Sequence, residues 1–423
     1  MRFEPGGMTD SNKILVVGAT GNIGHHVVAG LHARGAAVAA MSRSPAAGRF
    51  PAGVETVVGD LTAPDTFEHA LAGVDAVFLP WPFLTADGAP AVVEAIARHA
   101  RRVVYVSAIN VRDDRAPAAN GVWGQIEAAI RRTDLDWTFL RASGLATNTL
   151  AWAGAVRGGE PVRVPYPRAA RSLIHEKDIA EVALRALTEE GHARAVYLLT
   201  GPAAITQAEQ VRVLGVVAGQ PARVEEIAPA EARASMLTWA DADFADTALS
   251  YWASLVDTPE PVTRTVEELT GAPARTFEQW AGDHAGDLRP TSVPDIAERY
   301  VSAFRQGRMD VALGLMSPGV VRVAPMETGG ERRELRGLTE IMANSERLNQ
   351  NLRIHGVEVD GPFLDGDRFA VRFSFDETHT PTGRRSTAMK MCLYTVADGG
   401  ITREEVFYFD PPAGGGAGAE TVA

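Results

Sequence analysis

The sequence lacks several features that would point to a definite class of protein. It has one cysteine, Cys392, so no disulfide can form within the chain, and we expect a protein of the reducing cytoplasm. No apolar run approaches the roughly 20 residues that a membrane-spanning helix needs. Residues 1–13 contain no apolar stretch of the kind found in secretory signals. The sequence therefore predicts neither membrane insertion nor export.

Positive charge is scarce as well. The chain has 41 Lys and Arg residues against 53 Asp and Glu, a net charge of −12, and its lysines are Lys13, Lys177 and Lys390 alone. Nucleic-acid-binding proteins neutralise phosphates with clustered basic side chains, and no basic stripe stands out here. The histidine and acids around Lys177 also lack the spacing of metal ligands. We expect neither a nucleic-acid partner nor a metal site.

What is present is enough apolar material for more than one folded core. A chain of 423 residues exceeds one ordinary domain and suggests two or three. Its apolar fraction of 46% is that of a globular protein with cores of its own.

The first unit begins with a glycine turn in residues 13–28, KILVVGATGNIGHHVV. An apolar run ends at Gly18, Gly21 and Gly24 follow at three-residue intervals, and the apolar pattern resumes from Ile23. This order indicates a buried strand, a tight turn and the first turns of a helix. Glycine lets backbone N–H groups approach a phosphate closely, and the helix N-terminus adds partial positive charge. The stretch predicts a dinucleotide-binding fold.

The end of the next strand, expected at residues 36–41, bears on the choice of cofactor. In dinucleotide folds an acidic residue at this strand end holds the 2′-hydroxyl of NAD, whereas an arginine suits the 2′-phosphate of NADP. Arg43 stands there between Ser42 and Ser44, with no acid beside it. This favours NADP(H); the alternative is a solvated loop arginine.

Two further strand ends complete the expected cofactor site. Asp60 and Leu61 follow the third strand, where Asp60 would meet the adenine amino group. Pro80 and Trp81 follow the fourth strand as a stiff loop. Strands and helices alternate through residue 110, which is the pattern of a doubly wound parallel sheet. The residues expected to bind the cofactor are Gly18, Thr20, Gly21, Asn22, Ile23, Gly24, Ser42, Arg43, Asp60, Leu61, Pro80, Trp81 and Ser107.

These segments also carry a family resemblance. VVGATGNIG, the GDL element, VVYVSA and IEAAIRRTDLDWTFLRAS resemble the NmrA-like branch of atypical short-chain dehydrogenases/reductases. IHEKDIAEVALRAL and a later stretch extend the similarity to about Asp287. The resemblance implies a Rossmann-like cofactor half at residues 12–138. It also implies a smaller substrate-facing part, built from residues 141–171 and the region beyond Gly201.

The catalytic residues of the larger superfamily are incomplete here. Its ordinary members place a tyrosine and a lysine four apart on the helix after the fifth strand. This chain has no Tyr-x-x-x-Lys, and the stretch from Trp123 to Glu127 stands in that place. Ser107 lies where a serine would hydrogen-bond a substrate carbonyl; the alternative is a hydroxyl that satisfies a strand end. The proton must then come from another side chain, the substrate or water.

Other candidates of the first unit lie in the segments that follow. His175 is a candidate for the substrate cleft, with a packed or surface histidine as the alternative. Asp178 is expected to be the N-cap of a helix at residues 179–187. The family resemblance places Asn148 and Trp152 in the pocket wall. The catalytic candidates of this unit are Ser107, Trp123 and His175.

The second unit follows a stretch after Trp280, AGDHAGDLRPTSVP, which has no periodicity and is expected to be a linker. Two helices broken by Gly307 come next, and short alternating strands follow them. Asp398-Gly399-Gly400 predicts a hairpin turn between the last two strands. Helices followed by a curled antiparallel sheet indicate an α+β cone.

One strand shows which residues line the cone. Its apolar residues Phe369, Val371, Phe373 and Phe375 share one face, opposite Arg372, Ser374 and Asp376. LRGLTEIMANSE and YTVADGGITREEVFYFD resemble the SnoaL-like group of NTF2-type folds. Such cones enclose a pocket with projecting polar side chains, where a carboxylate has a raised pKa. The candidates are His355, Asp376, His379, Glu404, Glu405 and Tyr408, with Asp376 and Tyr408 expected to be catalytic.

The expected fold is an α/β Rossmann-like doubly wound parallel sheet followed by an α+β NTF2-like cone. We place an NmrA-like NADP(H)-binding reductase domain at residues 11–287 and a linker at 288–293. A SnoaL-like domain follows at 294–411, and the Gly-rich, low-complexity tail at 412–423 is expected to be disordered.

Three functions remain open at this point. The favoured one is an NADPH-dependent reductase of a small or polycyclic ketone, enone or quinone in specialised metabolism, whose fused cone binds or further processes the substrate. The second is a non-catalytic NADP(H)-sensing regulator. The third is a polyketide-cyclase-like or isomerase activity of the cone beside a helper reductase. A homodimer through the SnoaL-like domain completes the expected partners.

Overall fold

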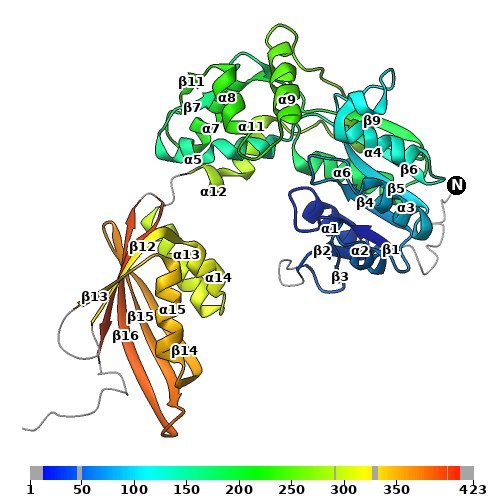
Figure 1. Ribbon diagram of the computed structural model, residues 1–423. Helices are drawn as coiled ribbons and strands as arrows, with labels where there is room; N and C mark the ends of the chain where they lie inside the picture. Colours follow the sequence, from blue (N-terminus) through cyan, green and yellow to red (C-terminus); the bar gives the residue numbers. More distant parts are fainter. Residues whose placement is uncertain (1–12, 45–49, 290–291, 326–331, 398, 410–423) are drawn as a thin grey trace, which may run out of the picture. The chain divides into compact units, whose positions relative to one another are not determined.

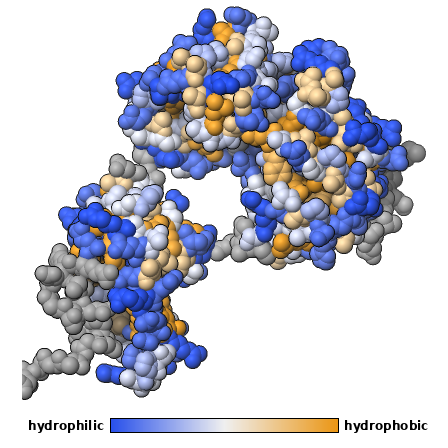
Figure 2. Space-filling view, viewed as in Figure 1, coloured by the Kyte–Doolittle hydropathy of each residue, from blue (hydrophilic) through white to orange (hydrophobic). Residues whose placement is uncertain are grey.

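The protein forms two compact units, residues 1–289 and 290–423, in a computed structural model (Figure 1). The structure describes residues 13–44, 50–289, 292–325, 332–397 and 399–409. The expected disordered tail at 412–423 lies outside the described residues. On the face shown in Figure 2, hydrophilic residues cover most of each unit, and apolar residues are scattered among the hydrophilic ones.

A seven-stranded parallel sheet forms the centre of the first unit. Its strand order is β3-β2-β1-β4-β5-β6-β9. The order reverses direction between β1 and β4, as in a doubly wound sheet, so the predicted fold class is confirmed. The strands are β1 (Lys13–Val16), β2 (Ala37–Ser42), β3 (Glu55–Val58), β4 (Ala76–Pro80), β5 (Arg102–Ala108), β6 (Asp136–Ala142) and β9 (Ala195–Leu199).

Helices cover both faces of this sheet because consecutive strand residues point to opposite faces. Leu15 of β1 packs in the apolar cluster with α2, α3 and α4. Its neighbours Ile14 and Val16 pack in the cluster with α1 and α6. These helices are α1 (Gly24–Ala33), α2 (Pro64–Ala70), α3 (Ala89–His99), α4 (Gly121–Arg131) and α6 (Glu176–Thr188).

A smaller lobe completes the first unit around the buried Trp280. Among the described residues it contains two short two-stranded sheets, β7–β11 and β8–β10, and several α-helices, whereas α10 packs against α6 and β9. Two 3₁₀ segments, η2 (Pro117–Asn120) and η3 (Ala146–Trp152), follow β5 and β6 along the chain. The bounds are β7 (Val162–Val164), β8 (Ala170–Arg171), β10 (Ile205–Thr206), β11 (Val224–Glu226), α5 (Ala153–Gly158), α7 (Gln207–Ala218), α8 (Pro229–Met236), α9 (Ala242–Ser254), α10 (Thr265–Thr270) and α11 (Phe277–Asp283).

Part of the expected linker belongs to this lobe. The stretch after Trp280 continues α11 to Asp283 and then forms α12 (Ala285–Leu288). Leu288 is fully buried, so the unstructured linker predicted from residue 281 onward is wrong over its first half. Helices this short carry too few residues to show an apolar period in the sequence.

The second unit packs three helices against a six-stranded sheet. The strand order is β13-β12-β17-β16-β15-β14. The pair β12–β17 is parallel and the others are antiparallel, so the expected purely antiparallel sheet is corrected to a mixed one. The elements are α13 (Val293–Arg305), α14 (Met309–Gly314), β12 (Met316–Pro325), β13 (Arg332–Arg336), α15 (Leu338–Asn349), β14 (Leu352–Asp365), β15 (Arg368–His379), β16 (Arg384–Ala397) and β17 (Gly400–Tyr408).

The apolar face predicted for β15 is confirmed. Phe369, Val371 and Phe373 are buried and Phe375 packs against the same cluster, which includes Tyr300 of α13. At the expected hairpin, Gly399 has φ of +73°, which favours glycine, while Asp398 lies outside the described residues. Among the described residues no helix is long and apolar enough to cross a membrane.

Candidate cofactor and substrate site

The glycine turn lies at the carboxyl end of β1. Gly18 has φ of +64° there, a backbone conformation that disfavours other residues. A β-carbon on Gly24 would collide with the Gly18 carbonyl oxygen and lie 2.8 Å from the carbonyl carbon. A β-carbon on Gly21 would lie 3.2 Å from the same oxygen. Glycine at position 24 is therefore required to close the turn.

Backbone donors at this turn point to an anion. The N–H of Gly21 closes the turn on the Gly18 carbonyl at 2.9 Å. Within the described part of the chain, the N–H groups of Thr20, Asn22 and Ile23 donate to no protein acceptor. They lie at the N-terminus of α1, where the helix dipole favours negative charge. These groups fit the pyrophosphate of a dinucleotide.

Arg43 and Asp60 lie at neighbouring strand ends. Arg43 is exposed directly after β2, and Ser42 donates its hydroxyl to the Ser44 carbonyl at 2.7 Å. Hydrogen bonds from the Thr62 N–H and hydroxyl lower the pKa of Asp60, and the charge of Arg43 adds to this effect. The two side chains are thus close enough to act on one adenosine group.

Pro80 and Trp81 lie beside the glycine turn. Pro80 ends β4, and its Cγ would lie 3.4 Å from a β-carbon on Gly18. The Trp81 indole donates to the Thr85 carbonyl at 2.8 Å and packs edge-on against Phe83. The expected cofactor residues therefore meet at the carboxyl edge of the sheet, around the point where the strand order reverses.

Ser107 does not reach a substrate. It is buried at 3% exposure, and its hydroxyl donates to the Glu127 carboxylate at 2.6 Å. Arg141 donates to both oxygens of that carboxylate, at 2.9 and 2.7 Å. The hydrogen bond to Glu127 occupies the hydroxyl inside the unit, which argues against the predicted role of this hydroxyl in binding a substrate carbonyl.

In ordinary short-chain dehydrogenases this helix carries the catalytic tyrosine and lysine. Here the corresponding helix, α4, packs against the apolar core. Trp123 of α4 is partly buried and packs on the apolar cluster of α2, α3 and α4. Glu127, four residues later, holds Ser107 and Arg141 as described above. Trp123 therefore contributes apolar packing and Glu127 an internal ion pair, whereas ordinary members of the superfamily carry catalytic side chains at these positions.

His175 is the N-cap of α6 and not a cleft residue. It is 1% exposed, and its Nδ1 accepts from the Lys177 N–H at 3.2 Å. Asp178, expected as the cap, lies in the first turn and accepts from the Arg275 N–H at 2.7 Å and from its guanidinium. The cap prediction is wrong by three residues, because an imidazole nitrogen can also accept the free N–H of a helix start.

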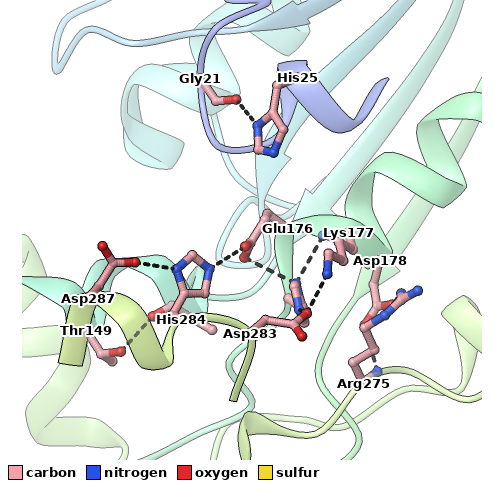
Figure 3. Close-up of polar contacts among 12 residues, drawn as sticks. Gly21, His25, Thr149, Glu176, Lys177, Asp178, Arg275, Asp283, His284 and Asp287 are labelled. Atoms are coloured by element: carbon pink, nitrogen blue, oxygen red, sulfur yellow. Dashed lines mark hydrogen bonds and ion pairs between the residues drawn. The ribbon is translucent and has the colours of Figure 1, made fainter. Parts of the chain in front are cut away.

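An ionic cluster that the sequence analysis missed surrounds this helix start (Figure 3). His284 lies between two carboxylates, with Nε2 2.8 Å from Glu176 and Nδ1 3.1 Å from Asp287. Burial opposes the charge of His284, but the two carboxylates outweigh it and raise its pKa. Burial likewise opposes ionisation of Glu176, yet the imidazoles of His175 and His284 lower its pKa to about 2. The cluster ties α6 to α11 and α12.

A pH dependence follows from His26, which lies on α1 beside this cluster. Burial and the neighbouring His25 lower the pKa of His26 to about 4, from 6.5. Between these pH values the unfolded chain binds the proton and the folded unit does not, so stability should fall as the pH drops from 6.5 to 4. We expect His26→Gln to reduce this slope in urea unfolding followed at several pH values. An unchanged slope would contradict the role of His26.

Buried polar atoms without partners mark the carboxyl ends of β5 and β6. Among the described residues, Asn110 Oδ1 and Thr147 Oγ1 are buried and make no hydrogen bond. Residue 109 donates its N–H to the carbonyl of Ala142, which brings Asn110 next to the end of β6. Thr147 is the second residue of η3, five residues beyond the end of β6. Buried polar atoms are usually paired, so these two unpaired atoms are exceptions at this edge of the sheet.

The pocket-wall residues named by family resemblance differ in exposure. Asn148 is exposed, and its N–H donates to the carbonyl of Leu145 at 3.0 Å. Trp152 is partly buried and packs in the apolar cluster of the small lobe. Asn148 therefore remains accessible next to Thr147.

In the second unit, Asp376 lies on the wrong face for a pocket. It pairs with Arg385 on the side of β15 opposite the apolar core, and the hydrogen bond from Arg385 lowers its pKa. The catalytic interpretation of Asp376 is therefore wrong: residues of alternating number face opposite sides, and the core takes the odd ones. His355 bonds Thr378 and Glu405 bonds Arg403, both away from that core. His379 lies at the end of β15 on the odd-numbered face and contacts Thr382.

The inner face of this sheet carries other polar groups. Glu404 is 2% exposed and pairs with Arg322 at 2.6 Å, while Tyr394 donates to it at 3.3 Å. Tyr408 pairs in register with Lys390, whose ammonium lies 5.5 Å from the ring centre of Phe373. Glu377 was missed; burial raises its pKa. The odd-numbered run from Phe369 onward could have revealed it.

Comparison with known proteins identifies the family. The chain is 35% identical over 281 residues to a (4-alkanoyl-5-oxo-2,5-dihydrofuran-3-yl)methyl phosphate reductase of Streptomyces griseus, a match that covers 66% of this chain and 99% of that protein. Residues 18–190 match the NAD(P)H-binding family model. The chain belongs to the NAD(P)H-binding family. Residues 297–404 match the SnoaL-like domain model, so both family resemblances are confirmed.

Other relatives of this NAD(P)H-binding protein agree. An NAD(P)H azoreductase of Xenophilus azovorans is 33% identical over 280 residues, covering 64% of this chain and 98% of the azoreductase. The fold of a Citrobacter sp. triphenylmethane reductase complexed with NADP(H) matches with a TM-score of 0.54 at 21% identity, over 64% of this chain and 99% of that one.

These findings confirm two predictions of the sequence analysis. The protein is an NAD(P)H-dependent oxidoreductase, and its first unit binds a nicotinamide dinucleotide. Among the described residues, no group of three or more His, Cys, Asp or Glu side chains could hold a metal ion.

Proposed function

We propose that the protein is an NADPH-dependent reductase of a small or polycyclic ketone, enone or quinone. The observation that carries this proposal is the similarity, over 66% of this chain and 99% of the relative, to a reductase whose named substrate is a phosphate ester of an acylated unsaturated lactone. Such a lactone presents a carbon–carbon double bond conjugated to carbonyl groups. Asn110 and Thr147 support it, since their unpaired polar atoms follow β5 and β6 at the same edge of the parallel sheet as the glycine turn.

The chemistry divides between the cofactor and this chain. When bound, NADPH supplies a hydride to an electrophilic carbon of the substrate. The glycine turn and the start of α1 would hold the pyrophosphate, and Arg43 would hold the 2′-phosphate. Thr147 has a hydroxyl free to hydrogen-bond a substrate carbonyl as negative charge develops on its oxygen. The balancing proton comes from water or the substrate, since Ser107 is engaged with Glu127.

The activity is tested by mixing the protein with NADPH and a panel of acylated butenolides, cyclic ketones and quinones. Loss of nicotinamide absorbance that depends on one compound class would support the proposal. No oxidation of NADPH with any class, in a protein that binds NADPH, would favour the sensing regulator instead.

The cofactor preference gives a prediction for Arg43. Arg43→Ala should weaken NADPH binding about tenfold to hundredfold, because one charge-assisted phosphate contact contributes about 1.5–3 kcal/mol. NADH has no 2′-phosphate, so its affinity should stay nearly constant. Titration calorimetry with both nucleotides measures this difference. Equal affinities of the unchanged protein for NADPH and NADH would rule the assignment out.

We propose that the SnoaL-like unit binds or further processes the substrate. Tyr408 and Lys390 share the face of the sheet that also carries the buried Glu377, so polar groups meet the apolar core there. Of the two catalytic candidates predicted in this unit, Tyr408 is the one that keeps a place on this face.

Truncation tests this division. The chain should be cut after Arg289, because Leu288 is buried in the first unit and Arg289 bonds the Val217 carbonyl. The shortened protein should bind NADPH with unchanged affinity and reduce a simple quinone, while its KM for the preferred substrate rises. If it reduces nothing while the separate second unit converts a polyketide-like ketone, the cyclase alternative is correct.

We further propose that the protein forms a homodimer through the SnoaL-like unit. Phe363, Met389, Phe407 and Phe409 are 38–57% exposed. The strand register places all four on the outer face of the sheet. An exposed apolar group of this kind suits a second copy of the same sheet. Sedimentation velocity of the full chain tests it, and a purely monomeric species at micromolar concentration would exclude it.

We also propose a cytoplasmic location. The single cysteine, Cys392, is fully buried, and burial raises the pKa of its thiol to about 12. A chain with one buried thiol gains no stability from an oxidising compartment. Cell fractionation with antibody detection measures the location directly.

A further inference from the structure

Arg171 is a largely buried cation whose donors the protein leaves free. Its side chain is 17% exposed, and its Nε is buried without a hydrogen-bond partner in the described ranges. Within the described ranges its one acidic neighbour is Glu260, 3.6 Å from Nη2, too far for a good hydrogen bond. A guanidinium presents five N–H donors and remains charged at any physiological pH.

The Glu260 carboxylate accepts its hydrogen bonds from residues other than Arg171. The carboxylate is fully buried and accepts the Ser172 N–H at 2.8 Å, the Ser172 hydroxyl at 3.0 Å and the Tyr251 hydroxyl at 2.5 Å. The Glu260 carboxylate therefore supplies a negative charge near the Arg171 guanidinium, but it does not accept a good hydrogen bond from the arginine N–H groups. A buried donor without an acceptor costs free energy that a ligand can recover.

The guanidinium is fixed beside the carboxyl end of β6. A β-carbon on Gly144 would overlap Nη2 and lie 2.5 Å from Cζ, so the guanidinium lies directly on the Gly144 backbone. The chain from Arg171 onward runs beside the segment after β6, through a bridge between Leu145 and Ile174. This is the same edge at which Thr147 has its free hydroxyl.

We propose that Arg171 anchors an anionic group of the substrate, a phosphate monoester or a carboxylate, next to the reacting end of the cofactor. The planar fork of an arginine matches the paired oxygens of either anion. Gly144 provides the space that the guanidinium needs. Glu260 attracts the guanidinium electrostatically and leaves its N–H donors free for a ligand. This inference rests on the proposed reductase function and names the substrate class of that site.

The test compares three substrates that differ in one group. They are an acylated butenolide with a free hydroxymethyl group, its phosphate monoester and its hemisuccinate ester. The unchanged protein should show a higher kcat/KM for one or both anionic compounds than for the neutral parent. The preferred anion identifies the source of the charge.

The variant is Arg171→Met, which keeps the length of the side chain and removes its charge. The ratio of kcat/KM for the preferred anion to that for the neutral parent should fall about tenfold to hundredfold, as expected for loss of a charge-assisted contact. The control is Arg168→Met, which removes an exposed arginine three residues away and should leave the ratio unchanged. Equal ratios for Arg171→Met and the unchanged protein would overturn the proposal.

A binding measurement covers the case in which the variant does not fold or nothing is reduced. With NADP+ at saturation, phenyl phosphate or benzoate should bind the unchanged full chain in calorimetry, whereas phenol should not. Anion binding without any NADPH oxidation would support the anion site at Arg171 and contradict the proposed reductase function. NADPH-dependent reduction without binding of either anion would do the reverse.

Discussion

Gly24→Ala should abolish NADPH binding. The new β-carbon would collide with the Gly18 carbonyl oxygen, lie 2.8 Å from that carbonyl carbon and lie 3.0 Å from the Ala19 Cα. All these atoms are backbone, and Gly18 at φ of +64° is already confined to a conformation that few residues adopt. The turn must open to relieve the overlap, which separates the N–H groups that would meet the pyrophosphate. Losing two such bonds implies at least about a hundredfold weaker affinity.

Calorimetric titration with NADPH measures this loss, and two variants make it interpretable. Gly154→Ala is the matched control, because Gly154 lies in α5 with open space around its β-carbon position. Gly21→Val serves if the Gly24 variant does not fold. The β-carbon at position 21 contacts the Gly18 oxygen at 3.2 Å, a strain that the turn can absorb, while the side chain occupies the phosphate position. A folded Gly21→Val protein with normal NADPH affinity would refute the phosphate site.

Glu127→Ala should destabilise the first unit by about 3–5 kcal/mol, the usual cost of removing one partner from a buried ion pair. Glu127 is 2% exposed and Arg141 5% exposed. The substitution leaves the buried guanidinium of Arg141 with Asp113, an exposed carboxylate, as its remaining acid. It also leaves the Ser107 hydroxyl without its acceptor.

Tryptophan fluorescence during urea unfolding reports this loss selectively. All seven tryptophans lie at or before residue 280, so the signal follows the first unit alone. Glu68→Ala is the control, since it removes an exposed pair with Arg98 and should change stability little. Glu127→Gln separates charge from shape: it should recover part of the lost stability through neutral hydrogen bonds. Stability of Glu127→Ala equal to that of the control would show that the pair contributes nothing.

The cofactor site could be predicted from the sequence because its determinants are local. Gly18, Gly21 and Gly24 act through backbone geometry within one turn, and Arg43 acts from the end of the next strand. In a parallel sheet, all strands end at the same edge, so strand ends identified one by one fall together in space. The same local logic identified the apolar face of β15.

The catalytic candidates failed for the opposite reason. Ser107 is at the predicted strand end, but its partner Glu127 lies on α4, and Arg141 reaches the same carboxylate from β6. Asp376 was chosen by residue type although the alternation along β15 already turned it away from the core. Whether a hydroxyl or carboxylate is free depends on side chains brought together by packing, and sequence spacing does not report them.

By itself the sequence determined the two fold classes, the position of the glycine turn and the nicotinamide-dinucleotide class of the cofactor, since periodicity, glycine and strand order act over short distances. Only the tertiary structure decided which polar groups remain available. It joined Ser107 to Glu127 across 20 residues and capped α6 with His175. Among the described residues it also left the Nε of Arg171 without a hydrogen-bond acceptor, while the carboxylate of Glu260, 89 residues away and 3.6 Å from Nη2, accepts from Ser172 and Tyr251. The partners of a polar side chain come from segments that are distant in the sequence and meet only in the folded protein. Whether a side chain remains free to bind a ligand is therefore decided by the tertiary structure.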